Sequence, residues 1–159
     1  LGNISEPGHQ IQLKWPNDVL LQEKKVAGIL LETKASQDEI PDWVIVGLGV
    51  NVSNFPDETL FPATSLVAEN WSVSVESILE AFARSFQIWA NNWMDSGFER
   101  VRRTWLSRAI GLGKTIEVRL ENKTITGVFK EIDQQGALII DQKGTEQRIT
   151  AGDVYFPNN

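Results

Sequence analysis

The residues best suited to chemistry begin with one run of five, Lys-Trp-Pro-Asn-Asp at residues 14–18. Trp15 precedes a proline and is pushed towards extended backbone, and the proline donates no hydrogen bond, so a regular strand ladder should break there. Asn17 and Asp18 then stand at a bend, where short polar side chains bond nearby backbone or face a ligand. A purely structural turn explains these five residues equally well.

A second suggestive stretch is the apolar run at residues 43–52, which two glycines interrupt. As a strand, it has faces that alternate with period two. One face is a core face; it carries Val44, Val46, Leu48, Val50 and Val52. The other carries Gly47, Gly49 and Asn51, so a ligand can lie against bare backbone with a carboxamide at its end. A bulge or a tightly packed helix crossing is an equal alternative. The run lacks the third glycine of the dinucleotide fingerprint, and no phosphate-cradling glycine loop occurs in the sequence.

Composition limits the class of protein. A chain of 159 residues with 42% hydrophobic and 23% charged residues fits one medium domain, alone or with a small module. A net charge of −6 without a basic stripe argues against nucleic acid binding. The absence of cysteine excludes disulfides, and the only histidine, His9, sits in a polar turn and is expected to be solvated, so neither a histidine triad nor a zinc site is expected. No run reaches membrane-spanning length, and no signal peptide is visible at Leu1.

Periodicity predicts the elements that must position these residues. Strands are expected at residues 11–14, 19–21, 26–34 and 43–52, with a hairpin turn at residues 22–25. Residues 1–10 are expected to hold a helix remnant and a Pro-Gly turn, and residues 35–42 a loop. Residues 53–65 form a long loop with Phe55 and Phe61 as apolar anchors, and such loops are lids or binding loops, or else disordered.

Two helices and a group of short strands follow. Apolar residues recur every three or four positions from Val75 to Trp93, which predicts an amphipathic helix with Ser74 as its N-cap. A second helix is expected after Gly97. The tryptophans at positions 71, 89, 93 and 105 are expected to be packing residues. Beyond Gly111, short strands at residues 115–120, 124–132, 137–141, 146–150 and 154–156 predict a small barrel.

In order and spacing, these motifs resemble biotin protein ligase, the biotin–[acetyl-CoA carboxylase] ligase. The resemblance rests on residues 14–18, 25–32 (Lys-Val-Ala-Gly-Ile-Leu-Leu-Glu), 47–51 (Gly-Leu-Gly-Val-Asn), 63–66 (Ala-Thr-Ser-Leu), 136–138 (Gly-Ala-Leu) and 151–154 (Ala-Gly-Asp-Val). It implies an α+β fold, a mixed sheet with packed helices of the class II aminoacyl-tRNA synthetase and biotin ligase type, followed by a small SH3-like β-barrel. The implied domains are residues 1–110, the C-terminal part of the catalytic domain, and residues 111–159, the SH3-like C-terminal domain. The resemblance also favours a lid that covers an adenylate for residues 53–65.

The family's basic glycine loop, of the Gly-Arg-Gly-Arg type, precedes the lysine–tryptophan motif and does not occur in these 159 residues. The chain is therefore expected to start in mid-domain and to be inactive on its own. Whether a DNA-binding repressor domain precedes it is left open, as are the acceptor carboxylase and the oligomeric state, for which a homodimer is one option.

The resemblance implies a cytoplasmic ligase that attaches biotin to a lysine of a biotin carboxyl carrier protein through biotinyl-5′-AMP. ATP and Mg²⁺ are the implied cofactors, and neither a membrane nor nucleic acid is an expected partner of this segment. Two alternatives stay open: a lipoate ligase or transferase of the same superfamily, and a non-catalytic module that binds biotin or adenylate. The residues 14–18 motif and the barrel favour biotin, whereas the missing loop favours the non-catalytic module.

The motif match implies a role for each site residue. The catalytic residues are Lys25 and Asp18, and Asp18 either positions the incoming amine or binds Mg²⁺ through water. Biotin contacts are expected from Lys25, Gly28, Ile29 and Leu30, with the backbone of Gly28 and Ile29 against the ring. ATP or adenylate contacts are expected from Lys14, Trp15, Asn17, Gly47, Gly49 and Asn51. From the residues alone, Lys25 is more simply an exposed hairpin lysine like Lys24, and only the motif reverses that preference.

Overall fold

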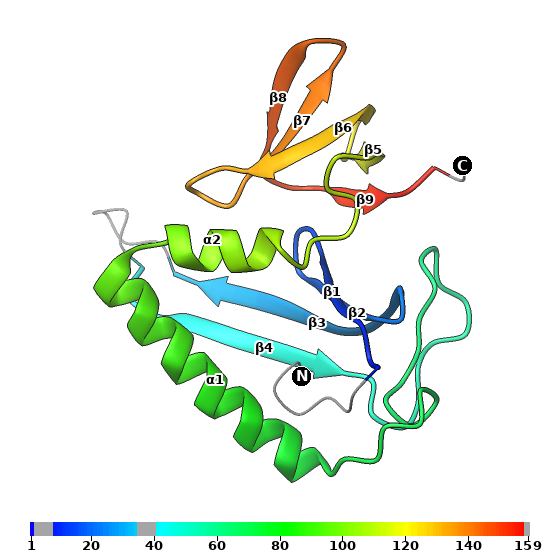
Figure 1. Cartoon of the computed structure of the whole chain (residues 1–159), viewed down its shortest axis with the longest axis vertical. Helices are drawn as coiled ribbons and strands as arrows, with labels where there is room; N and C mark the ends of the chain where they lie inside the picture. The colour runs from blue at the N-terminus through cyan, green and yellow to red at the C-terminus, as the bar shows by residue number, and fades with distance from the viewer. Residues whose placement is uncertain (2–7, 35–40, 158–159) are drawn as a thin grey trace.

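The computed structural model describes residues 1, 8–34 and 41–157, so most of the expected helix remnant at residues 1–10 and of the loop at residues 35–42 lies outside the described residues. Two antiparallel sheets and two helices give the α+β fold that the sequence predicted (Figure 1). The first sheet, ordered β1-β2-β3-β4, consists of β1 (Ile11–Lys14), β2 (Asp18–Leu21), β3 (Lys24–Thr33) and β4 (Val44–Val50). The second, ordered β8-β7-β6-β5-β9, consists of β5 (Thr115–Arg119), β6 (Thr124–Ile132), β7 (Leu138–Gln142), β8 (Thr145–Ile149) and β9 (Asp153–Tyr155). The helices α1 (Val75–Ser96) and α2 (Glu99–Leu106) separate the two sheets in the sequence.

Turn geometry sets the register of the first sheet. Gln22 and Glu23 have φ values of 51° and 63°, the left-handed pair that a two-residue hairpin turn requires. A register shift between Val19 and Leu20 then places Lys25 opposite Leu20. Among the described strands every pairing is antiparallel, and the parallel component of the expected mixed sheet reduces to two isolated bridges, Leu13↔Ala109 and Lys25↔Ala63.

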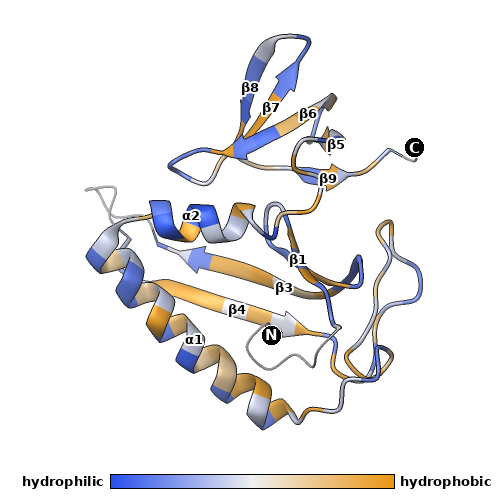
Figure 2. Ribbon diagram, viewed as in Figure 1, coloured by the Kyte–Doolittle hydropathy of each residue, from blue (hydrophilic) through white to orange (hydrophobic). Residues whose placement is uncertain are grey.

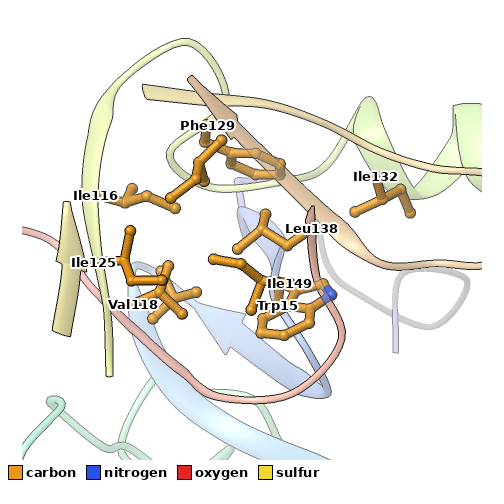
Figure 3. Packing of buried hydrophobic residues seen from close by; sticks show 10 residues of the cluster. Trp15, Ile116, Val118, Ile125, Phe129, Ile132, Leu138 and Ile149 are labelled. Carbon is orange, nitrogen blue, oxygen red and sulfur yellow. The ribbon is translucent and has the colours of Figure 1, made fainter. Parts of the chain in front are cut away.

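The second sheet encloses the larger hydrophobic core. Its inward positions alternate with exposed ones, as a half-buried strand requires. Ile116, Val118, Phe129, Leu138 and Ile140 are each 2% exposed or less. Phe98, Trp105 and Leu106, from α2 and the residue before it, pack against this cluster. Trp15, from the turn after β1, is also a member, and Figure 3 shows its indole among the side chains of the C-terminal strands.

The first sheet rests on a smaller core that Leu21, Val26, Leu66, Trp71 and Ile78 form. His9 stacks on the Trp71 ring with 5.2 Å between ring centroids, and its Nε2 lies 3.0 Å from the Glu69 carbonyl oxygen. The expectation of a solvated His9 was therefore wrong, because the ring covers one side of this core.

The long helix confirms its predicted start but not its predicted burial. The Ser74 side chain accepts a hydrogen bond from the Ser77 N–H, as an N-cap should. Ile78 is the buried residue of α1, whereas Leu79 and Trp93 are 64% and 58% exposed. Val44, expected on a core face, is 51% exposed. Figure 2 shows apolar stretches along α1 and β4, and in the described part of the chain little packs over them.

Candidate functional site

Three charged side chains form the centre of the candidate site. Lys14 and Asp18 face each other as cross-strand partners of the β1–β2 pair, and Lys14 Nζ lies 2.9 Å from Asp18 Oδ2. Lys25 Nζ, from β3, lies 2.6 Å from the other oxygen, Oδ1. Lys14 and Asp18 are buried, whereas the Lys25 side chain is 43% exposed. The cluster has two cations for one carboxylate, so it presents positive charge through Lys25.

Gly28 provides the space that lets Lys25 reach Asp18. Gly28 is the cross-strand partner of Asp18. A Cβ added at Gly28 would lie 3.5 Å from Lys25 Cε and 3.8 Å from Asp18 Oδ1. The lysine side chain therefore lies across the bare backbone of Gly28, where an added Cβ would already be in van der Waals contact with it, and a side chain longer than that of alanine would compete for its space.

The backbone of Lys25 is held by the end of the long loop. Lys25 N–H donates to the Pro62 carbonyl at 2.7 Å, and Thr64 N–H donates to the Lys25 carbonyl at 2.9 Å. Asn51 also connects Lys25 to the end of the loop, because its side-chain amide donates to the carbonyls of Thr64 at 3.0 Å and Lys25 at 3.4 Å. With its N–H groups committed, Asn51 offers a ligand its amide oxygen, which can only accept.

Two cavities meet at Lys25 and Asn51. The larger, of about 610 Å³, lies over β3 and β4; its lining includes Ala27, Gly28, Leu30, Gly47, Leu48, Gly49 and Val50, with Asn17 at its edge. The smaller, of about 280 Å³, contains Lys14 and Asp18 and is closed by Pro56, Thr59, Phe61 and Ala63 of the loop and by Asp153 and Tyr155 of β9. A ligand that spanned both would pass the Lys25 ammonium, with its apolar part over the glycines and its charged part at the lysines.

Some residues of the smaller cavity were not predicted as site residues. The Phe61 ring lies 5.0 Å from Lys14 Nζ, a cation–π contact that helps to offset the burial of the lysine. The sequence marked Phe61 only as an apolar anchor. Asp153 and Tyr155 come from the other end of the chain. Asp153 lies in the match at residues 151–154, whereas Tyr155 was predicted only as part of a strand.

A second polar contact braces the β2–β3 turn against the loop. Glu69 accepts hydrogen bonds from the Thr64 hydroxyl at 2.7 Å and from Lys24 Nζ at 3.0 Å. These two bonds, the Thr64 one first, hold the pKa of the Glu69 carboxyl below its ordinary value. The ionised Glu69 carboxylate therefore links Lys24 to Thr64, whose backbone N–H donates to the Lys25 carbonyl.

Comparison with known proteins identifies the family. Residues 1–107 match the model of the biotin/lipoate A/B protein ligase family, and residues 111–156 match that of the biotin protein ligase C terminal domain. The chain belongs to the biotin/lipoate A/B protein ligase family. The resemblance that the motifs carried is thereby confirmed, and within the family it points to the biotin protein ligases.

Named relatives agree with this assignment. The chain is 38% identical over 162 residues to a biotin–[acetyl-CoA-carboxylase] ligase of Paracoccus denitrificans, covering 98% of this chain and 67% of that protein. It is 33% identical to the bifunctional ligase/repressor BirA of Bacillus spizizenii, covering 92% of this chain and 46% of that protein. The biotin protein ligase from Aquifex aeolicus in complex with biotin and ATP superposes with a TM-score of 0.73 at 28% identity, covering 91% of this chain and 61% of that one. The chain thus spans between about half and two thirds of the length of these relatives.

The structure brings most of the predicted site residues together. Asn17, Lys25, Gly28, Leu30, Gly47, Gly49 and Asn51 line the larger cavity, and Lys14, Asp18, Lys25 and Asn51 line the smaller one. The residues predicted to contact biotin and those predicted to contact ATP do not lie in separate cavities, because the larger cavity is lined by members of both groups.

Two predicted contacts do not reach a cavity. Trp15, expected at the nucleotide, is 5% exposed, and its indole N–H donates to the Gly136 carbonyl at 3.1 Å, so its ring serves the C-terminal core. Ile29, expected to contact biotin through its backbone, donates its N–H to the Asn17 carbonyl at 3.0 Å. The Ile29 carbonyl accepts from Asn17 Nδ2 at 2.7 Å. The backbone at Ile29 therefore holds Asn17.

The surroundings of Asp18 do not fit a magnesium ion. Each carboxylate oxygen already bonds a lysine ammonium, and two adjacent cations repel a third. Mg²⁺ favours several oxygen ligands, but among the described residues no group of three or more acidic, histidine or cysteine side chains could hold a metal. The expectation of magnesium at Asp18 thus has no support in the geometry.

Among the described helices, none combines the length and apolar character that crossing a membrane would take.

Proposed function

We propose that the protein attaches biotin to a lysine of a biotin carboxyl carrier protein, using ATP and passing through biotinyl-5′-AMP. The observation that carries this proposal is the position of the Lys25 ammonium, which Asp18 holds where the two cavities meet. The relatives named as biotin–[acetyl-CoA-carboxylase] ligases and the Aquifex aeolicus complex with biotin and ATP support the same substrates.

In the first step, a biotin carboxylate oxygen attacks the α-phosphorus of ATP. A carbon–oxygen–phosphorus anhydride forms, the bond from the α-phosphorus to the bridging oxygen breaks, and pyrophosphate leaves. Negative charge builds on the phosphoryl oxygens in the transition state, and a fixed cation lowers that barrier. Lys25 is the group in this chain that supplies the charge, and its half-exposed ammonium can bond both substrates.

In the second step, the neutral amine of the carrier lysine attacks the carbonyl carbon of biotinyl-5′-AMP. An amide bond forms, the bond from the carbonyl carbon to the phosphate oxygen breaks, and AMP leaves, while the proton that the amine loses passes to solvent water. Asp18 lies beside Lys25 at the smaller cavity, and the remaining lone pairs of its carboxylate can accept a hydrogen bond from the amine and orient it.

We assign biotin and its side chain to the larger cavity, because the apolar Leu30 side chain stands on the same face of the sheet as the floor that Gly28, Gly47 and Gly49 form. The nucleotide phosphates then lie towards Lys14 and Lys25. The adenine amino group is the donor that suits the Asn51 oxygen, since the Asn51 amide hydrogens are already committed.

The test is a transfer assay with the full-length protein, labelled biotin, ATP, magnesium and a carrier domain. Parallel reactions replace biotin with lipoate, or replace the carrier lysine with arginine. Biotin transfer that requires the lysine supports the proposal. Transfer of lipoate in preference to biotin would make this a lipoate ligase, and binding of biotin without adenylate formation would make it a non-catalytic module.

A further inference from the structure

The C-terminal strands contribute to the site through a residue of the motif itself. Trp15 stands between Lys14 and the turn that leads to Asp18, yet its side chain belongs to the core of the second sheet. Figure 3 shows the indole beside Ile149 and Leu138. The neighbouring Lys14 is 5% exposed and depends on Asp18 for its counter-charge.

The partner of the Trp15 indole is held firmly. Its N–H donates to the Gly136 carbonyl at 3.1 Å, in the turn between β6 and β7. Asp133 closes that turn, because its Oδ1 accepts from the Gln135 N–H at 2.8 Å and the Ala137 N–H at 2.9 Å. Arg148 Nε lies 2.5 Å from Asp133 Oδ2 and fixes the carboxylate in turn.

The strand before Trp15 is held from the same side. Leu13 N–H donates to the Arg108 carbonyl, and Ile110 N–H donates to the Leu13 carbonyl, both at 2.9 Å. These contacts attach β1 to the segment that leads into β5. The Lys14–Asp18 turn is thus fixed by the C-terminal part along its backbone and at Trp15.

We propose that Trp15 is a positioning residue, through which the second sheet holds the Lys14–Asp18 pair and thereby the Lys25 ammonium. The relay runs from Asp133 to the Gly136 carbonyl, to the indole, and to the charge cluster. The second sheet is then part of the scaffold of the site. A tryptophan that served only to fill the core would affect stability alone.

The first measurement does not depend on any activity. A brief pulse of acetic anhydride on the full-length protein, read by mass spectrometry, compares acetylation of Lys14 with that of exposed Lys123. The variants are Trp15→Ala, Trp15→Phe and Asp133→Ala. The matched control is Ile140→Ala, which empties the same core at a fully buried position on β7. Comparison at equal distance below each variant's melting temperature removes the effect of global unfolding.

Trp15→Ala is expected to raise the Lys14-to-Lys123 labelling ratio at least tenfold. Trp15→Phe and Asp133→Ala should raise it several-fold, because each loses one link of the relay while the core stays filled. Ile140→Ala should stay within twofold of the unchanged protein. Equal ratios in Trp15→Ala and Ile140→Ala, or no rise in any variant, would overturn the proposal. Should Trp15→Ala fail to fold, Trp15→Phe and Asp133→Ala decide the outcome by the same criterion.

The second measurement rests on the proposed ligase activity. Because Lys25 acts on charge that develops in the transition state, Trp15→Phe should lower kcat for adenylate formation about tenfold with KM for biotin nearly unchanged. Ile140→Ala should change both by less than threefold. If Trp15→Phe and Ile140→Ala changed kcat and KM in the same way, Trp15 would act only through its packing in the core. Absence of activity in the unchanged protein would reject the proposed function, and the labelling result would still stand.

Discussion

The two sheets of this protein differ in how completely they bury their apolar side chains. The second sheet encloses Phe129, Leu138 and Ile140 at 2% exposure or less, with α2 and Trp15 closing the core. The first sheet and α1 leave Leu30, Leu31 and Leu79 more than 60% exposed. Stability is therefore concentrated in the C-terminal part, while the first sheet keeps an open glycine face where a ligand can lie. The attachment at Trp15 joins the well-packed part to the sheet that carries Lys14, Asp18 and Lys25.

The largest expected effect tests packing itself. Phe129→Ala should lower the free energy of unfolding of the 159-residue chain by about 3–5 kcal/mol, because a buried aromatic ring leaves a cavity. Phe86→Ala on α1, a position that is 50% exposed, should cost no more than about 0.5 kcal/mol. Urea unfolding followed by circular dichroism measures both. Equal losses would show that the two parts are buried alike and would remove the contrast.

A loss nearly as large is expected at Lys25, for which we propose a catalytic role. Lys25→Ala in the full-length protein should slow biotinyl-adenylate formation by two or more powers of ten, about 3 kcal/mol, since it removes a preorganised cation. Lys24→Ala is the control, because its partly exposed contact with Glu69 contributes about 1 kcal/mol or less. Pyrophosphate release measures both rates. Similar small effects of the two substitutions would take Lys25 out of the mechanism.

The open face of the first sheet can be closed by a single side chain. A Cβ at Gly49 meets only the Gly28 carbonyl, at 4.0 Å, so Gly49→Val should fold normally and fill the larger cavity. It should abolish the thermal shift caused by a stable biotinyl-adenylate analogue. Val50→Ala is the neighbouring control. It should lower the melting temperature of the free protein but leave the thermal shift caused by the analogue largely unchanged.

Asn51→Ala should weaken ATP binding by about 1–3 kcal/mol, since the Lys25 and Thr64 carbonyls and the adenine amine lose a partner. Calorimetry with ATP and with inosine triphosphate gives the sharper result. Inosine triphosphate has a carbonyl where the adenine of ATP has its amino group. The unchanged protein should therefore bind it more weakly than ATP, whereas Asn51→Ala should bind the two nucleotides about equally. Equal discrimination by both proteins would place Asn51 away from the base.

The smallest effect concerns the brace at Glu69 and depends on pH. The Thr64 and Lys24 bonds lower the pKa of this carboxyl in the folded state, so its stabilisation is present above the ordinary value of 4.5. That stabilisation is lost as pH falls through the lowered pKa. Glu69→Gln should cost about 1 kcal/mol at pH 7 and less at pH 3, which lies below the ordinary pKa of the carboxyl. Urea unfolding at both pH values measures this, with exposed Glu121→Gln as the control. A pH-independent cost would mean that the carboxylate charge is not what the brace uses.

Much of the fold followed from local patterns. The strands from residue 11 onward, the hairpin turn before Lys25, the Ser74 cap and the C-terminal strands were all predicted to within a few residues. These features depend on periods of 2 and 3.6 residues and on turn chemistry, which neighbouring residues decide. The motif residues could be predicted too, because their types and spacing survive in a single sequence.

Only the tertiary structure decided which side chains meet. The placing of Trp15 in the second core and of Phe61 over Lys14 depends on segments far apart in the chain. The position of Asp18 between two lysines depends on the register of the three consecutive strands β1, β2 and β3. The same holds for His9 against Trp71. Periodicity tells that a side chain faces inward, but it does not tell which of two cores will receive it. That choice follows from how the two sheets pack, because a buried indole or ammonium is stable only where the surrounding elements supply its hydrogen-bond or charge partner.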